Sequence, residues 1–396
     1  MCSNSRITSS FHGKIFEVAG ISVDNFEEHN LQSRAFFLSH CHSDHTKGLF
    51  SSKLLRTLEC NGIYIYMSEL TAAIISDDCN GDASLMNKIV TLDYGTTVVT
   101  LPSYFGYEEQ HLRVTLIKAG HCLGSVMFLF ETNESTVLYT GDFNLRFTDV
   151  KQLVSLHDLN KKPIKIDTLY VDTTFIDYGH EYFPKRSEVM NELMAVIKEW
   201  LHKDNKNRIA LSLSAKYGYE YVFAEIYNKL GMKVYVNEER WAFYRQHPNL
   251  AAGVTNDEHK SRLHVCRGST HRSCSIKQTF GLNFLTIRFS AMIWSEYETE
   301  TSGVQKISDD KVNVCFATHC SRSQIIDFVT YFNPKRVIGF PNKYESDSSP
   351  FKEKADVELN CIVTPRKRKI ESPLFKKTSA VDKKVDKKVL KNLFDL

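Results

Sequence analysis

Three histidines and one aspartate lie within six residues of the chain, at His40, His42, Asp44 and His45. Imidazole and carboxylate groups together suit zinc and similar divalent ions, and open sites built from them catalyse hydrolysis. The spacing allows two ions, because His40 and His42 can face one way while Asp44 and His45 serve a second ion. A histidine-rich surface loop is the simpler interpretation, but the apolar run 34–38 predicts a buried strand leading into the motif.

Two further candidate ligands each follow a predicted strand. His121 comes after the β-like run 114–117, and Asp142 comes after the run 137–139. Loops at the carboxyl ends of strands are common places for chemistry in α/β proteins. We therefore expect one ion on His40, His42 and His121, a second ion on Asp44 and His45, and Asp142 as the bridge between them.

Asp24 follows the short apolar run 21–23. We expect its carboxylate to orient the ligands from outside the metal shell, as such groups do in many metal sites. A plain turn aspartate is the alternative. A water shared by two ions would lose a proton near neutral pH and act as a nucleophile.

The elements around these residues predict an α/β fold. Residues up to about 172 are rich in short strands. Helical periodicity then appears at 187–202, 216–230 and 324–332, with predicted strands at 208–213, 233–236, 312–316 and 336–340. This β-α-β order indicates a parallel sheet covered by helices. The apolar content of 42% over 396 residues supports two domains or one large domain.

These four segments resemble the metal motifs of the metallo-β-lactamase superfamily and match them in order: Asp24, the motif from His40 to His45, His121 and Asp142. The resemblance implies a four-layered αββα sandwich. The segment 171–175 and His319 look like two motifs of the β-CASP branch, in which an inserted α/β domain covers the active site. We therefore expect sandwich segments at 1–175 and 311–361, an inserted domain at 176–310, and a basic disordered tail at 362–396.

Within this branch the resemblance also implies roles for Asp44, Asp172 and His319 in catalysis. A carboxylate beside an imidazole favours its protonated form, so Asp172 would support His319 as the acid that protonates the leaving oxygen. Direct contact between Asp172 and the second ion is the alternative. RNA-processing members carry a further metal-binding histidine about twenty residues later. Here His319 is the last histidine and Val337 stands in the expected strand, which favours DNA.

The sequence resembles the Artemis family of DNA end-joining nucleases, from about residue 21 to residue 340. This resemblance implies a structure-specific endonuclease with some 5′ exonuclease activity, which acts on hairpins and overhangs. The DNA-dependent protein kinase and the end-joining ligase complex would be partners. Zn²⁺ is the expected cofactor, with Mg²⁺ or Mn²⁺ as further supporting ions. The chain departs from the family at Leu123, Asn144 and residues 320–324, but no ligand is lost.

Three other classes of protein remain open at this stage. An RNA endonuclease of the same branch is disfavoured by the missing histidine. A small-molecule hydrolase is disfavoured by the large insertion and by the pairing of Asp172 with His319. A non-catalytic DNA-binding scaffold would be marked by lost ligands, which the sequence does not show.

A phosphate site is expected at the turn between a predicted strand and the helix 216–230. Ser212, Ser214 and Lys216 lie there, and backbone N–H groups at helix starts favour anions. Ser321, beside the expected scissile site, is a further candidate DNA contact. An ordinary capped helix is the alternative. DNA affinity from lysine and arginine should fall as salt rises.

A second zinc site is implied by the Artemis resemblance, within the inserted domain. His264, Cys266 and Cys274 match three of its ligands, while Tyr235 stands where the family has a histidine. His271 can complete a tetrahedral Cys2His2 set in its place. A degenerate loop with free thiols is the alternative.

The last 36 residues contain eleven lysines and arginines against four acidic residues, although the whole chain has a net charge of only +3. The run 365–369 resembles a nuclear import signal, and we expect a nuclear protein. The first 20 residues have no apolar signal core, and the apolar runs are too short to span a membrane. Ten scattered cysteines favour a reducing compartment.

Overall fold

The computed structural model of the chain describes residues 10–266, 281–295 and 302–344. The predictions for His271, for Cys274 and for the basic tail at 362–396 lie outside these ranges. Within them, no helix is long and apolar enough to cross a membrane.

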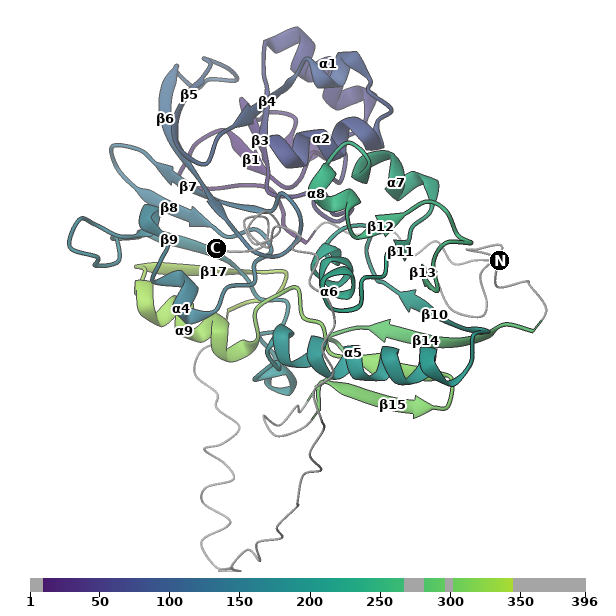
Figure 1. The fold of residues 1–396 in the computed structure, drawn as a ribbon. Helices are drawn as coiled ribbons and strands as arrows, with labels where there is room; N and C mark the ends of the chain where they lie inside the picture. Colours follow the sequence, from purple (N-terminus) through teal and green to yellow (C-terminus); the bar gives the residue numbers. More distant parts are fainter. Residues whose placement is uncertain (1–9, 267–280, 296–301, 345–396) are drawn as a thin grey trace, which may run out of the picture. The chain divides into compact units, whose positions relative to one another are not determined.

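The first part of the chain, together with a returning segment near residue 340, forms two sheets that pack face to face (Figure 1). One sheet has four parallel strands in sequence order. They are β1 (Ile21–Val23), β2 (Ala35–Leu38), β3 (Ile65–Ser68) and β4 (Ile89–Leu92). The other sheet has the order β17-β9-β8-β7-β6-β5. Its strands are β5 (Gly95–Leu101), β6 (Gln110–Lys118), β7 (Val126–Glu131), β8 (Thr136–Tyr139), β9 (Thr168–Asp172) and β17 (Arg336–Phe340).

Helices cover the outer faces of both sheets. The four-stranded sheet carries α1 (Ser52–Asn61), α2 (Glu69–Asp78) and the short α3 (Ala83–Met86). The six-stranded sheet carries α4 (Phe147–Val150) and α9 (Arg322–Phe332). Single 3-10 turns are η1 (Glu28–Asn30), η2 (Val154–Leu156) and η3 (Tyr178–His180).

Three apolar clusters hold these four layers together. Phe37 of β2 meets Phe128 of β7 between the sheets, with ring centroids 5.4 Å apart. Leu138 packs with Phe328 beneath α9, and Phe36 packs with Leu54 beneath α1. Burying large apolar side chains is the main favourable term in folding. The predicted αββα sandwich is confirmed.

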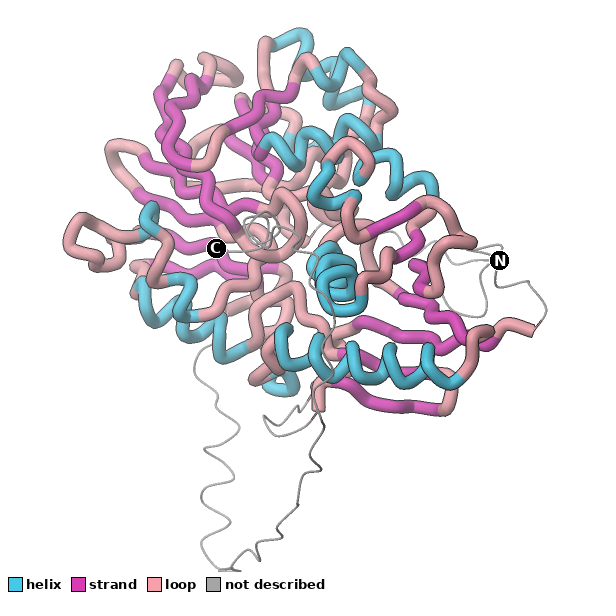
Figure 2. Tube along the Cα trace, in the orientation of Figure 1, coloured by secondary structure: helices cyan, strands magenta, loops and turns pink. Residues whose placement is uncertain are grey.

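The inserted domain is a seven-stranded sheet with the order β12-β11-β13-β10-β14-β16-β15, parallel except at β15 (Figure 2). Its strands are β10 (Asn207–Ser212), β11 (Val234–Tyr235), β12 (Val254–Thr255), β13 (Leu263–Val265), β14 (Asn283–Phe289), β15 (Val304–Ser308) and β16 (Lys311–Val314). Its helices are α5 (Arg186–Lys203), α6 (Glu220–Leu230), α7 (Glu238–Tyr244) and α8 (Pro248–Ala251). The boundary expected at residue 310 falls between β15 and β16, which pair antiparallel, so this sheet extends to Val314.

The helix expected from residue 216 begins at Glu220 instead. Gly218 adopts a positive φ of 110°, which L side chains rarely adopt, and its N–H donates to Glu220 Oε2 at 2.8 Å. The preceding residues therefore form a loop rather than a first helical turn. The other predicted helices agree with α5 and α9 to within a few residues.

Candidate metal centre

The expected ligands lie on loops that follow neighbouring strands. The motif from His40 to His45 follows β2, His121 follows β6, and Asp142 follows β8. The backbone of Val126, at the start of β7, donates to Ser39 O at 3.0 Å, which ties the His40 loop to the six-stranded sheet. The structure thus brings together side chains that are about a hundred residues apart in the sequence.

Asp142 lies at the meeting point of the histidines. Its Oδ2 atom is 3.6 Å from Nε2 of His40 and 3.6 Å from Nε2 of His121. Its Oδ1 atom is 3.2 Å from Nε2 of His45. One oxygen of this carboxylate faces His40 and His121, and the other faces His45. A ligand that bridges two ions would need this arrangement.

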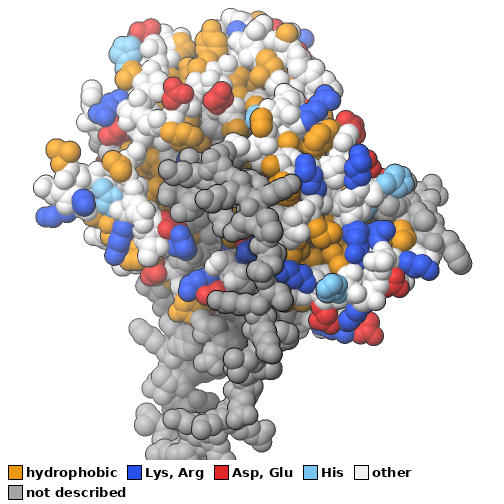
Figure 3. Space-filling view, viewed as in Figure 1, with side chains coloured by type: hydrophobic (Ala, Val, Ile, Leu, Met, Phe, Trp, Pro, Cys, Tyr) orange, Lys and Arg blue, Asp and Glu red, His pale blue; other side chains and the backbone are white. Residues whose placement is uncertain are grey.

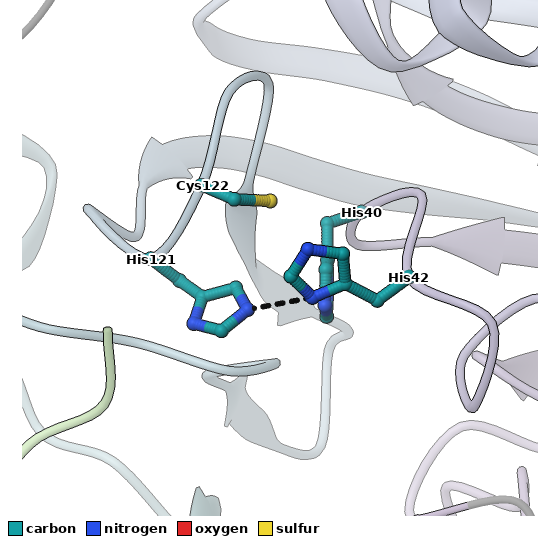
Figure 4. A group of neighbouring side chains, drawn as sticks. All are labelled: His40, His42, His121 and Cys122. Carbon is teal, nitrogen blue, oxygen red and sulfur yellow. Dashed lines mark hydrogen bonds between the residues drawn. The ribbon is translucent and has the colours of Figure 1, made fainter. Parts of the chain in front are cut away.

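His42 turns Nδ1, rather than Nε2, toward the other histidines. Its Nδ1 atom is 3.0 Å from Nε2 of His121, while its Nε2 atom lies 3.2 Å from the carbonyl oxygen of Tyr217 (Figure 4). When Nε2 donates to that carbonyl, Nδ1 keeps its lone pair for a ligand bond. The contact also ties the metal loop to the inserted domain.

His40 shows that this donor set fits a metal ion. The residue is fully buried, yet its Nε2 atom has no hydrogen-bond partner. Buried polar atoms without partners are rare because they are costly. Burial and the surrounding histidines hold the pKa of both His40 and His121 well below the usual value, so both imidazoles are neutral and can coordinate.

The second expected set is also assembled. Asp44, His45 and Asp142 offer one ligand atom each within 4.8 Å of one another. Nε2 of His45 lies 3.5 Å from Oδ2 of Asp44 and 2.9 Å from Oγ of Ser10. Burial opposes a charge on His45, but Asp142 and Asp24 outweigh it and raise its pKa well above the usual value.

Asp24 lies buried behind His45 rather than in an exposed turn. Its Oδ2 atom is 2.8 Å from Nδ1 of His45 and accepts from the Tyr139 hydroxyl at 2.9 Å. Its Oδ1 atom accepts from the Ser39 N–H at 2.7 Å. This carboxylate fixes the ring orientation of His45 and directs Nε2 toward Asp142.

Asp172 and His319 form a pair beside the cluster. Nδ1 of His319 is 2.7 Å from Oδ2 of Asp172, and Nε2 of His319 is 3.9 Å from Oδ2 of Asp142. The other oxygen of Asp172 accepts from the N–H and the hydroxyl of Thr174. Burial lowers the pKa of His319, but Asp172 and Asp142 outweigh it and raise the value to about 9.

Val337 is not the residue of β17 that lies beside this pair. It is in register with Leu169 and packs in the cluster beneath α9, whereas Phe340 is in register with Asp172. Three residues of strand span about 10 Å. The position near the centre is therefore the end of β17, and no histidine occurs there either.

The loop that carries His319 is held by residues that sequence reasoning missed. The carbonyl oxygen of Ala317 accepts from Nε and Nη2 of Arg186, at 3.1 and 2.8 Å, and from Nδ2 of Asn144 at 2.9 Å. The next carbonyl, that of Thr318, lies 2.9 Å from Nδ1 of His121. Asn144 could have been found from the sequence, because the chain departs from the family pattern at that residue. Nothing in the sequence marked Arg186.

A cavity of about 800 Å³ runs from the metal loop into the inserted domain. His42 and Asp44 line it on one side, and Ser214, Lys216 and Arg240 line it on the other. A space of this size accommodates a nucleotide-sized ligand.

The expected phosphate-site residues are only partly brought together. Lys216 Nζ forms ion pairs with Asp78 at 2.8 Å and Glu239 at 3.2 Å, which link α2 to the inserted domain. Ser214 Oγ is 2.6 Å from Tyr219 OH. Ser321 caps α9, accepting from Gln324 N, and like Ser212 it does not line the cavity.

Half of the expected second zinc site can be described. His264 is buried on β13, its Nε2 atom 2.9 Å from the Ser261 carbonyl, and Nδ1 is buried without a hydrogen-bond partner. Cys266, two residues further along the chain, is buried as well, and the Tyr235 ring lies 5.1 Å from the His264 ring. This site therefore stays a prediction.

Comparisons with known proteins agree with this architecture. A family model described as DNA repair metallo-beta-lactamase matches residues 248–343. Protein artemis of Homo sapiens is 34% identical over 346 residues, which are 84% of this chain and 49% of that protein. DNA cross-link repair protein SNM1 of Arabidopsis thaliana is 25% identical over 332 residues, 80% of this chain and 63% of that protein.

A shorter match is to 5′ exonuclease Apollo of Rattus norvegicus, 36% identical over 168 residues, 42% of this chain and 28% of that protein. The chain spans about half the length of the Artemis proteins it matches. The family-model match covers part of the inserted domain and the loop of His319, and the centre has the donor set of a metal cofactor. Over most of its own length the chain is therefore similar to the Artemis proteins, and residues 248–343 match the DNA repair metallo-beta-lactamase family.

Proposed function

We propose that this chain is a metal-dependent deoxyribonuclease that hydrolyses phosphodiester bonds at hairpins, overhangs and damaged ends during double-strand break repair by end joining. The observation that carries the proposal is Asp142, whose two oxygens face separate histidine sets while His319 lies beside them. The names of the relatives, which include a 5′ exonuclease and a DNA cross-link repair protein, and the description of the matching family model support the same activity.

The residues divide into ligands and proton donors. His40, His42 and His121 would hold one Zn²⁺, and Asp44 and His45 a second divalent ion, with Asp142 between them. When bound, such ions activate a water nucleophile and stabilise charge on the scissile phosphate. His319 then gives its Nε2 proton to the leaving oxygen. Both oxygens of Asp172 are engaged by His319 and Thr174, which favours a positioning role over contact with the second ion.

DNA is favoured over RNA by the lack of any histidine after His319. Lysine and arginine side chains are frequent over the inserted domain in Figure 3, and such side chains bind phosphate backbones. Ser214 and Lys216 would meet the backbone in the cavity, with Ser212 and Ser321 as more distant candidates. The same proposal implies a nuclear protein that works with the DNA-dependent protein kinase and the end-joining ligase complex.

The test offers labelled hairpin DNA, overhang DNA and sequence-matched RNA to the purified chain with Zn²⁺, Mg²⁺ or Mn²⁺. We expect cleavage of both DNA substrates and none of the RNA. Asp142→Ala should abolish cleavage, while the exposed Asp93→Ala serves as its matched control. Cleavage of RNA alone would overturn the proposal, and so would equal activity of the Asp142 variant.

A further inference from the structure

Two residues that line the cavity beside the metal loop carry buried hydrogen-bond donors without partners in the described part of the chain. Tyr217 is only 2% exposed, and its hydroxyl makes no hydrogen bond there. Arg240 donates through Nη2 to the Ala215 carbonyl at 2.9 Å, but its buried Nη1 atom has no such acceptor. Buried donors are rarely left unpaired, because each one costs free energy. We therefore expect a ligand in the cavity to supply the acceptors.

An anionic oxygen suits these donors best. The Arg240 guanidinium is always charged, and its hydrogen bonds to phosphate are roughly twice as strong as those between neutral groups. The buried Glu220 carboxylate interacts electrostatically with Arg240 and offsets part of that charge. Asp78 and Glu239 also line the cavity, but Lys216 forms ion pairs with both. A backbone phosphate is the anionic group that the proposed DNA substrate would bring to this wall.

An exposed aromatic ring lines the same cavity. Phe50 follows His45 by five residues, is 54% exposed and lines the cavity together with Asp44. Single exposed rings are common on protein surfaces, but this one shares a cavity with the unpaired donors. Bases of single-stranded DNA stack on such rings. Because paired bases already stack on their neighbours, only an unpaired base offers a free face to the ring.

We propose that Phe50, Tyr217 and Arg240 hold one unpaired nucleotide of the DNA strand beside the metal centre. Phe50 stacks on the base, while Arg240 Nη1 and the Tyr217 hydroxyl donate to oxygens of the adjoining backbone. The carbonyl of Tyr217 lies 3.2 Å from Nε2 of His42, so this subsite adjoins a metal ligand. It rests on the proposed nuclease function and deepens it, because it selects DNA whose strand is unpaired next to the scissile phosphate.

The first test moves one abasic nucleotide stepwise along the cleaved strand of an overhang DNA, with the full chain and its metal ions. We expect one position at which the missing base slows single-turnover cleavage by the wild type by about 5–100-fold. Phe50→Ala should cleave the intact DNA more slowly by a similar factor and should ignore the abasic nucleotide. Phe50→Trp should restore both properties. Phe105→Ala, at an exposed ring that does not line the cavity, is the matched control.

The second test replaces one phosphate at a time, other than the scissile one, by an uncharged methylphosphonate. At one linkage near the abasic-sensitive nucleotide the wild type should slow by about 10–100-fold. Arg240→Met should lose this sensitivity, and Tyr217→Phe should show a smaller change at the same nucleotide. Arg245→Met, at the exposed end of α7, is the control. The scan changes the DNA rather than the protein, so the wild-type result decides the matter even if a variant fails to fold.

The outcomes separate this subsite from the nuclease function itself. A wild type that cleaves DNA but has no abasic-sensitive position would overturn the subsite and leave the nuclease function standing. The subsite is also wrong if Phe50→Ala keeps the abasic sensitivity, or if Arg240→Met keeps the methylphosphonate sensitivity. A wild type that cleaves no DNA would remove the nuclease function and the subsite together.

Discussion

Nδ1 of His319 lies 2.7 Å from Oδ2 of Asp172, although 147 residues separate them in the chain. The inserted domain occupies most of that interval, so its folding returns the chain to the end of β9. Because Asp172 holds Nδ1, the other nitrogen of His319 faces Asp142 at 3.9 Å. The insertion therefore completes the centre as well as covering it.

His319 should give the reaction an alkaline limb. As an acid it must be protonated, so the single-turnover rate should fall as pH rises through its pKa, which Asp172 and Asp142 raise to about 9 without ions. Bound cations would lower that value, placing the limb at or below pH 9. In His319→Ala the rate should fall by about 10²–10⁴ and the limb should vanish.

Asp172→Asn provides the companion measurement for that pH profile. It removes the nearest carboxylate that raises the pKa of His319, so the limb should move to lower pH. A limb that stays in place in both variants would exclude His319 as the acid.

Asp24→Asn should weaken the ion bound at His45 without touching any ligand. The carboxylate fixes the His45 ring at 2.8 Å and accepts from the Tyr139 hydroxyl. Losing such a partner costs about 10–100-fold in metal affinity. Isothermal titration with Zn²⁺ measures this change, with Asp93→Asn as the exposed control. Equal affinities would mean that Asp24 has no part in the centre.

Arg186→Met should lower the turnover rate more than it changes KM. Arg186 makes two hydrogen bonds to the Ala317 carbonyl, and its guanidinium lies 5.2 Å from the centre of the Phe316 ring. Removing it frees the loop that positions His319, and hydrogen bonds to charged groups contribute about 1.5–3 kcal/mol.

Arg186→Lys should rescue this loss only in part, because lysine keeps the charge but lacks the paired N–H geometry. Steady-state kinetics with hairpin DNA, alongside the exposed neighbour Lys185→Met, separate the two parameters. A change in KM alone would argue against a positioning role.

Lys216→Met should reduce the dependence of DNA binding on salt. If Lys216 leaves Asp78 and Glu239 to bind a phosphate, its loss should lower the slope of log K against log salt by about one. Asp78→Asn should tighten binding, because it releases the lysine. Lys203→Met, on an exposed part of α5, is the control. If the slope is unchanged and the Lys216→Met variant is less stable, then Lys216 only links the two domains and does not bind DNA.

The sequence by itself determined the ligand candidates. Those from His40 to His45 fall in one short loop after a strand, and His121 and Asp142 each follow a strand of strong β pattern, so local spacing was enough to group them. The αββα layers followed from the family resemblance, and the helices α5 and α9 from their apolar periodicity.

Only the tertiary structure decided how the centre is supported. The bond of Asp24 to His45, the hold of Arg186 on Ala317 and the ion pairs of Lys216 join segments far apart in the chain. Likewise, the register of β17 with β9, not spacing, places Phe340 rather than Val337 beside Asp172. Such contacts depend on which strands pair and which layers pack together, and a local pattern of residues does not encode that choice.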